Sequence, residues 1–153
     1  MSSAKFNGII ISYMGNTNGR DEENENRLKY VKQTLSSGLH VCINVVFKSG
    51  AFLLPCGADE YEVVPPVILS HHHVWCNAID TYTLEALCDL NAHCFFMGSG
   101  ACTLTSNQFI WSLPGVALTD RSIAAFPELA EDTNWLATAE PAGLCTNFPA
   151  QYT

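Results

Sequence analysis

Charged side chains are scarce in this sequence. They make up 14% of its 153 residues, whereas an average soluble domain carries about 25%. Basic side chains are the scarcest, with 7 Lys and Arg against 15 Asp and Glu and a formal net charge of −8. Proteins bind nucleic acid and anionic membranes mainly by placing Lys and Arg against phosphate. We therefore expect neither nucleic acid nor a membrane among the partners.

The shortage of charge also limits how the chain can cover its surface. Apolar residues make up 48% of the sequence. Contiguous exposed apolar surface commonly marks a site of protein association. Two interpretations stay open at this point: a protein that hides surface against protein partners in an oligomer or large assembly, and an unusually apolar monomer.

Signals of secretion and of membrane insertion are missing as well. The first residues, Met1 to Lys5, contain no charged segment followed by an apolar one, and no apolar run reaches the roughly 20 residues that span a bilayer. No Cys-x-x-Cys pair occurs, and the number of cysteines is odd. We therefore expect free, buried thiols in a reducing intracellular compartment. The cysteines are Cys42, Cys56, Cys76, Cys88, Cys94, Cys102 and Cys145.

No internal repeat, linker or low-complexity stretch divides the chain, so we predict one domain over residues 1–153. Leu28, Val31 and Leu35 share one face of a helix that Asp21 would cap. Thr83 would cap a second helix, and the segment 127–141 is a helix or a long loop. Short apolar runs predict strands at 8–13, 40–47, 51–54, 74–76, 93–97, 109–111, 122–126 and 143–145.

The order of these elements predicts an α/β fold. Strand–helix–strand units fill the first hundred residues, and short strands with little room for helices follow. This pattern is typical of a compact, reduced (β/α)8 TIM-type barrel in which some helices have shrunk to loops, because a full barrel of this class has about 250 residues. An open α/β sheet is the alternative.

Several short motifs occur in the order in which a known family carries them. The sequence contains Gly38-Leu-His-Val-Cys-Ile-Asn-Val45, then Trp75-Cys-Asn-Ala-Ile79 before Leu84-Glu-Ala-Leu87, Cys102-Thr-Leu-Thr-Ser106, Trp111-Ser-Leu-Pro-Gly115 and finally Gly143-Leu-Cys-Thr-Asn-Phe-Pro149. Together they resemble the glycerophosphodiester phosphodiesterases, and most of all the short bacterial and viral members of that phospholipase-C-like superfamily. The resemblance spans nearly the whole chain and implies a barrel with a catalytic mouth at the C-terminal ends of its strands.

The resemblance also implies which positions once carried the chemistry. Such enzymes need carboxylates for a divalent cation, histidines for proton transfer and a cation for developing negative charge. At the matching positions this chain has neutral residues, and Cys42 and Asn44, at i and i+2, point to the same side of their strand. The degenerate site comprises Tyr13, Met14, Cys42, Asn44, Cys56, Asn77, Ile79, Met97 and Asn147. We therefore expect no catalytic residue, no metal ion and no cofactor.

Other groups of polar residues permit different chemistry. Two histidines of the run His71–His73 could hold a metal ion, although a polar surface loop is the simpler interpretation. Cys42 and Cys56 could bind a soft metal together with a histidine. The acidic stretch from Asp59 to Glu62 could form a displaced metal site or a solvated loop.

Two hypotheses about function follow. The first is a non-catalytic structural or interaction protein, a pseudoenzyme that serves as a subunit of a larger assembly such as a virus particle. The second is a phosphodiester hydrolase with a rearranged metal site. A small-molecule sensor that reuses the old pocket is a third, weaker possibility.

Overall fold

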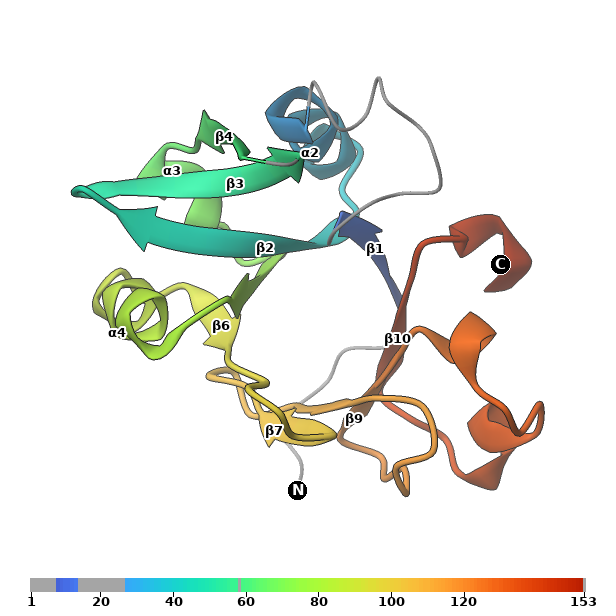
Figure 1. Ribbon diagram of the computed structural model, residues 1–153. Helices are drawn as coiled ribbons and strands as arrows, with labels where there is room; N and C mark the ends of the chain where they lie inside the picture. Colours follow the sequence, from blue (N-terminus) through green and yellow to red (C-terminus); the bar gives the residue numbers. More distant parts are fainter. Residues whose placement is uncertain (1–7, 14–26, 58, 153) are drawn as a thin grey trace.

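The computed structural model describes residues 8–13, 27–57 and 59–152. Its strands belong to one sheet that curls around an apolar interior (Figure 1). The strands that pair in parallel are β1 (Gly8–Tyr13), β2 (His40–Lys48), β5 (Val74–Ala78), β6 (His93–Phe95), β8 (Ile110–Ser112), β9 (Ser122–Ala125) and β10 (Gly143–Thr146). Their spatial order is β6-β5-β2-β1-β10-β9-β8, so the first and last strands are neighbours.

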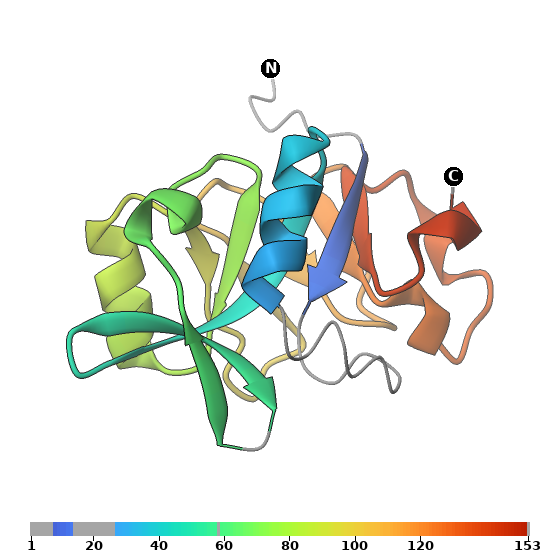
Figure 2. The ribbon, with the colours of Figure 1, turned by 90° about the horizontal axis from the view of Figure 1, so that it is seen from above.

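Three further strands pair antiparallel. β3 (Ala51–Gly57) forms the predicted hairpin with β2, and β4 (Glu60–Val63) adds to its far side. β3 and β4 extend away from the curled set of parallel strands (Figure 2). β7 (Cys102–Leu104) pairs antiparallel with β8. β7 is not among the predicted strands; it is short and has two exposed residues out of three.

Helices cover the outside of only part of the sheet. α2 (Arg27–Ser36), α3 (Pro66–Leu69) and α4 (Thr81–Asp89) precede β2, β5 and β6. The connection from β9 to β10 carries only the 3-10 helices η1 (Pro127–Leu129) and η2 (Trp135–Thr138), and η3 (Pro149–Tyr152) follows β10. No helix in the described part of the chain is long and apolar enough to cross a membrane.

The architecture is therefore a sheet-dominated α/β fold with a curled half-barrel and few helices, and it is not a clear (β/α)8 barrel. The physical reason lies in the connections. Only residues 113–121 separate β8 from β9, and they include Pro114 and Gly115, which disfavour a helix. The α/β prediction is confirmed at this coarser level.

The start of α4 differs from the prediction. Asp80, not Thr83, is the N-cap, and its carboxylate accepts a hydrogen bond from the Thr83 backbone N–H at 2.7 Å. Thr83 is fully buried inside the helix, and its hydroxyl accepts a hydrogen bond from the Phe47 N–H at 2.9 Å. Thr83 thus joins α4 to β2. The predicted cap of the first helix, Asp21, lies outside the described residues.

Alternating side chains divide the core into two layers. Cys42, Trp75 and Phe95 point inward, whereas their neighbours Ile43, Cys76 and Cys94 point outward against the helices. Aromatic rings fill the interior: Phe95 stacks on Trp111 at a centroid distance of 4.4 Å, and Trp75 lies 5.4 Å from Phe109 and 6.0 Å from Trp111. Contrary to the expectation that the thiols are buried, Cys88 and Cys102 are exposed.

Ser106 joins β6 to the turn between β7 and β8, where the parallel pairing is interrupted. Its backbone N–H donates to the Cys94 carbonyl at 2.9 Å. Its hydroxyl oxygen accepts from the Cys94 N–H at 2.8 Å, and the hydroxyl donates to the Ala92 carbonyl at 3.2 Å. We call this set of hydrogen bonds the Ser106 bridge. These hydrogen bonds satisfy backbone groups of β6 that would otherwise be unpaired at an open edge of the sheet.

Replacing Ser106 by alanine should destabilise the fold by about 1–3 kcal/mol, because the buried Cys94 N–H loses its acceptor. Urea unfolding of the purified variant measures this loss. Ser37→Ala is the matched control, since its exposed hydroxyl donates a hydrogen bond to the Gln33 carbonyl within the same helix end. It should change stability by no more than about 0.5 kcal/mol. Equal losses of stability in the two variants would contradict the claim that the Ser106 bridge stabilises β6.

Candidate functional site

The C-terminal ends of parallel strands meet at one edge of the sheet, where the resemblance places the former catalytic mouth. Asn44 on β2 and Asn77 on β5 are register partners at this edge. The Asn77 Nδ2 donates a hydrogen bond to the Asn44 Oδ1 at 2.8 Å. Each amide therefore satisfies part of the other's hydrogen-bonding capacity. Neither group carries charge at any ordinary pH.

Cys42 lies one layer deeper on the same face of β2 as Asn44. Its side chain is fully buried in the inner core cluster with Trp75 and Cys145. Burial, followed by a hydrogen bond with Cys145, raises the pKa of the Cys42 thiol well above its usual range. The raised pKa favours the protonated thiol, which is less nucleophilic than the thiolate.

Met97 and Asn147 extend the same edge. Met97 follows β6 and packs against the inner cluster. Asn147 follows β10; its backbone N–H donates to the Glu128 carboxylate at 3.3 Å, and its buried Oδ1 has no hydrogen-bond partner among the described residues. Glu128 also accepts from the Thr146 hydroxyl at 2.7 Å. Sequence reasoning missed Glu128 because it lies in the segment 127–141, whose conformation the pattern left open.

The remaining predicted residues do not join this group. Tyr13 packs against the outer core cluster, with its hydroxyl 3.3 Å from the Thr34 hydroxyl. Ile79 follows β5 and is 47% exposed. Cys56 lies on the β3 extension, where burial and then Glu62 raise its pKa. Met14 lies outside the described residues. By strand alternation the inward residue of β1 is Ser12, which is buried and is the register partner of Cys42.

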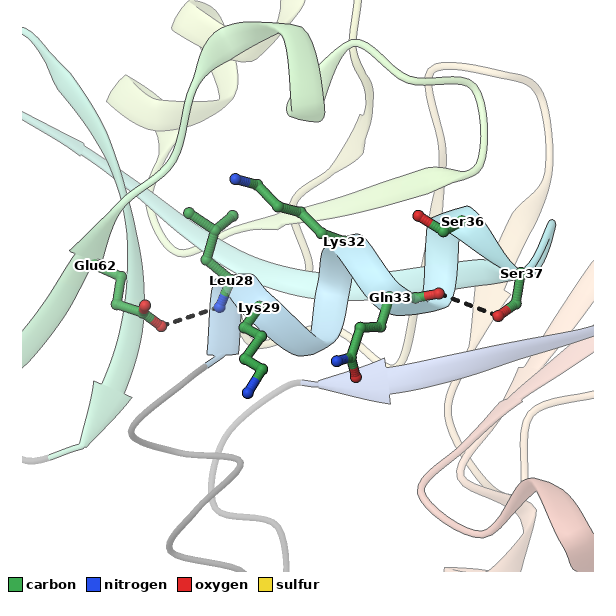
Figure 3. Close-up of a pocket in the computed structure, with 7 residues that line it drawn as sticks. All are labelled: Leu28, Lys29, Lys32, Gln33, Ser36, Ser37 and Glu62. Atoms are coloured by element: carbon green, nitrogen blue, oxygen red, sulfur yellow. Dashed lines mark hydrogen bonds between the residues drawn. The ribbon is translucent and has the colours of Figure 1, made fainter.

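The acidic stretch considered as a displaced metal site is used differently. Glu62 accepts a hydrogen bond from the Leu28 N–H at 3.0 Å and so caps the first turn of α2 (Figure 3). It lies at one end of a surface groove of about 660 Å³ along α2, which also presents Lys29 and Lys32. Asp59 and Glu60 are exposed. Within residues 8–13, 27–57 and 59–152, no three His, Cys, Asp or Glu side chains are arranged to hold a metal ion.

The opposite, N-terminal edge of the sheet gathers all of the chain's histidines, and we call these residues the histidine cluster. His40 and His93 begin β2 and β6, and His73 precedes β5. The His40 and His73 rings stack at 4.0 Å, and the centroids of His72 and His73 are 4.4 Å apart. The cluster comprises His40, His71, His72, His73 and His93. The run 71–73 was visible in the sequence. The other two members of the cluster, His40 and His93, join it because they begin β2 and β6.

Burial favours the neutral form of three members of this cluster, His40, His71 and His93. The Trp75 Nε1–H donates to the His40 Nδ1 at 3.0 Å, which fixes that nitrogen as an acceptor. Burial, followed by the neighbouring histidines with His73 first, lowers the His40 pKa from 6.5 to about 4. The pKa values of His71 and His93 are also lowered, mainly by burial. A protonated cluster would place several like charges in contact.

Acid should therefore destabilise the protein through this cluster. A folded-state pKa below the unfolded value of 6.5 gives stability that is present above pH 6.5 and is lost as pH falls toward about 4. His40→Asn keeps a neutral acceptor for Trp75 but cannot be protonated. Between these pH values the variant should lose less unfolding free energy than the wild type, by on the order of 2 kcal/mol after allowing for partial exposure. If the unfolding free energies of the variant and the wild type, measured with urea, change in parallel with pH, then His40 does not account for the loss of stability in acid.

No protein-family model, curated protein or solved structure matches the chain. The resemblance to the phosphodiesterases thus rests on the chain's own short motifs, and membership of that family stays a proposal.

Proposed function

We propose that the protein is a non-catalytic structural or interaction protein, built on a reduced phosphodiesterase-type (β/α)8 barrel and serving as a subunit of a larger assembly such as a virus particle. The observation that carries this proposal is the Asn44–Asn77 hydrogen bond of 2.8 Å. It lies where the resemblance implies a metal-binding carboxylate and a proton-transferring histidine. Two neutral amides that bind each other supply neither function.

The strand arrangement supports the barrel relationship. The parallel strands follow chain order around the sheet, and β10 returns to pair with β1. Inward side chains of neighbouring strands fill the interior, as in the packed core of a barrel. Missing helices in the second half account for the small size of the chain.

The surface supports the assembly part of the proposal. β4 is an edge strand of the described sheet, and its Tyr61 and Val63 are 48% and 64% exposed on one face. Val67 and Leu129 are still more exposed, at 73% and 70%. Exposed apolar residues on an open edge favour association with another chain.

A direct test of the loss of catalysis is hydrolysis of an aryl phosphodiester by purified protein with Mg²⁺, Ca²⁺ or Mn²⁺. We expect the rate of the buffer alone, because loss of several transition-state interactions costs about 10² or more each. Elemental analysis of protein purified without chelator accompanies this assay. Turnover with stoichiometric metal that disappears in Asp59→Ala or Cys42→Ala would establish the rearranged hydrolase instead.

The assembly proposal has a separate test. Light scattering of the purified protein over a range of concentrations should reveal oligomers or larger particles. Binding of an apolar dye to the dissociated protein should report the surface that association covers. A clean monomer at all concentrations that binds no dye would contradict the proposal, whatever the hydrolysis assay shows.

A further inference from the structure

Two cysteine side chains outside the site described above are in contact. Cys88 lies in the last turn of α4, and Cys94 lies in the middle of β6. Their Sγ atoms are 3.7 Å apart. A disulfide bond is about 2.05 Å long, so a small movement of the two side chains would join them.

Backbone hydrogen bonds hold the two sulfurs in place. The Asn91 N–H donates to the Cys88 carbonyl at 3.0 Å, and the Ala92 N–H donates to the Leu87 carbonyl at 3.1 Å. Asn91 has a φ of 59°, the left-handed conformation that commonly ends a helix. On the other side, the Ser106 bridge fixes both backbone groups of Cys94. The pair is therefore positioned by the fold.

The two thiols differ in their access to solvent. Cys88 is exposed and lines a surface cavity of about 400 Å³ together with Asn91, Ser106 and Asn107. Cys94 is only 2% exposed. Burial, together with its contact with Cys88, raises the pKa of Cys94 to about 11 despite a hydrogen bond with Ser106. An external reagent thus meets Cys88 first.

We propose that Cys88 and Cys94 form an oxidative modification site, at which a low-molecular-weight disulfide such as oxidised glutathione converts the two thiols into one intramolecular disulfide. Cys88 is the entry thiol and Cys94 the resolving thiol. The product would tie the end of α4 to β6 beside the Ser106 bridge, the place where parallel strand pairing is interrupted.

The reaction proceeds by two thiol–disulfide exchanges. The Cys88 thiolate attacks oxidised glutathione, an S–S bond forms at Cys88, and one glutathione thiolate leaves. Cys94 then gives its proton to solvent and its sulfur attacks the Cys88 Sγ, which expels the second glutathione thiolate. Two protein thiols are oxidised, one glutathione disulfide is reduced to two glutathione molecules, and the protons released by the cysteines match those taken up by glutathione.

The experiment incubates the full-length folded protein with mixtures of oxidised and reduced glutathione, followed by acid quenching and peptide mass mapping. We expect a Cys88–Cys94 cross-link with the loss of two hydrogen atoms. The effective concentration of the Cys94 thiol toward Cys88, measured against glutathione, should exceed the millimolar value of a short flexible linker. It should be at least about tenfold higher in the folded chain than in the chain unfolded in urea. An equal or lower value in the folded chain would overturn the proposal.

Variants separate the two roles. Cys94→Ser should stop at a stable glutathione adduct on Cys88, and Cys88→Ser should leave Cys94 unmodified because it is buried. Cys102→Ser is the matched control, since Cys102 is also exposed, and it should form the cross-link at the wild-type rate. A persistent glutathione adduct on Cys88 in the wild-type protein would contradict a resolving role for Cys94. Should Cys94→Ser not fold, the Cys88→Ser result and the folded-to-unfolded comparison still decide the matter.

Discussion

The structure depends on filling the inside of a curled sheet with large aromatic side chains. A sheet that curls must bury its inner face, and here the aromatic rings pack with smaller inward residues such as Cys42 and Cys145. Trp75, Phe95 and Trp111 come from three strands, and the Trp111 ring lies 4.4 Å from Phe95 and 6.0 Å from Trp75. Each buried aromatic ring contributes a large share of the apolar area removed from water. The inner layer thus packs the inward faces of β5, β6 and β8 against one another.

This constraint separates the two edges of the sheet chemically. Above the aromatic layer, the C-terminal edge presents the neutral amides of Asn44 and Asn77. Below it, the N-terminal edge presents the histidine cluster, tied to the layer by the Trp75–His40 hydrogen bond. The Asn44–Asn77 pair, at the edge that would carry catalysis in the proposed relatives, is therefore uncharged, whereas the histidines lie at the opposite edge of the sheet.

The local patterns in the sequence predict the elements well where apolar runs are continuous. The strand at 40–47 and the hairpin that follows it match β2 and β3 closely. Cys42 and Asn44, predicted to share a face, lie on the same side of β2, since a strand alternates with a period of two. The cap of α4 was misplaced by three residues because Asp80 and Thr83 are both good cap residues, and only the fold buries Thr83.

Long-range features were beyond the reach of the sequence. His40 and His93 join His71–His73 only because parallel strands bring their starting residues to one edge. The contact between Cys88 and Cys94 depends on the turn at Asn91, and the Ser106 bridge depends on a strand, β7, that shows no clear apolar pattern. Pairwise proximity of this kind follows from topology and not from local composition.

The central claim is that aromatic packing holds the parallel strands in place while a neutral pair, Asn44 and Asn77, occupies their C-terminal edge. A crystal structure grown with Mg²⁺ and a phosphodiester tests this claim most directly. It should show Asn77 donating to Asn44 over the stacked Phe95 and Trp111 rings, with neither a cation nor a phosphodiester bound at that edge. A cation coordinated there, with the Asn44–Asn77 hydrogen bond broken, would contradict the account.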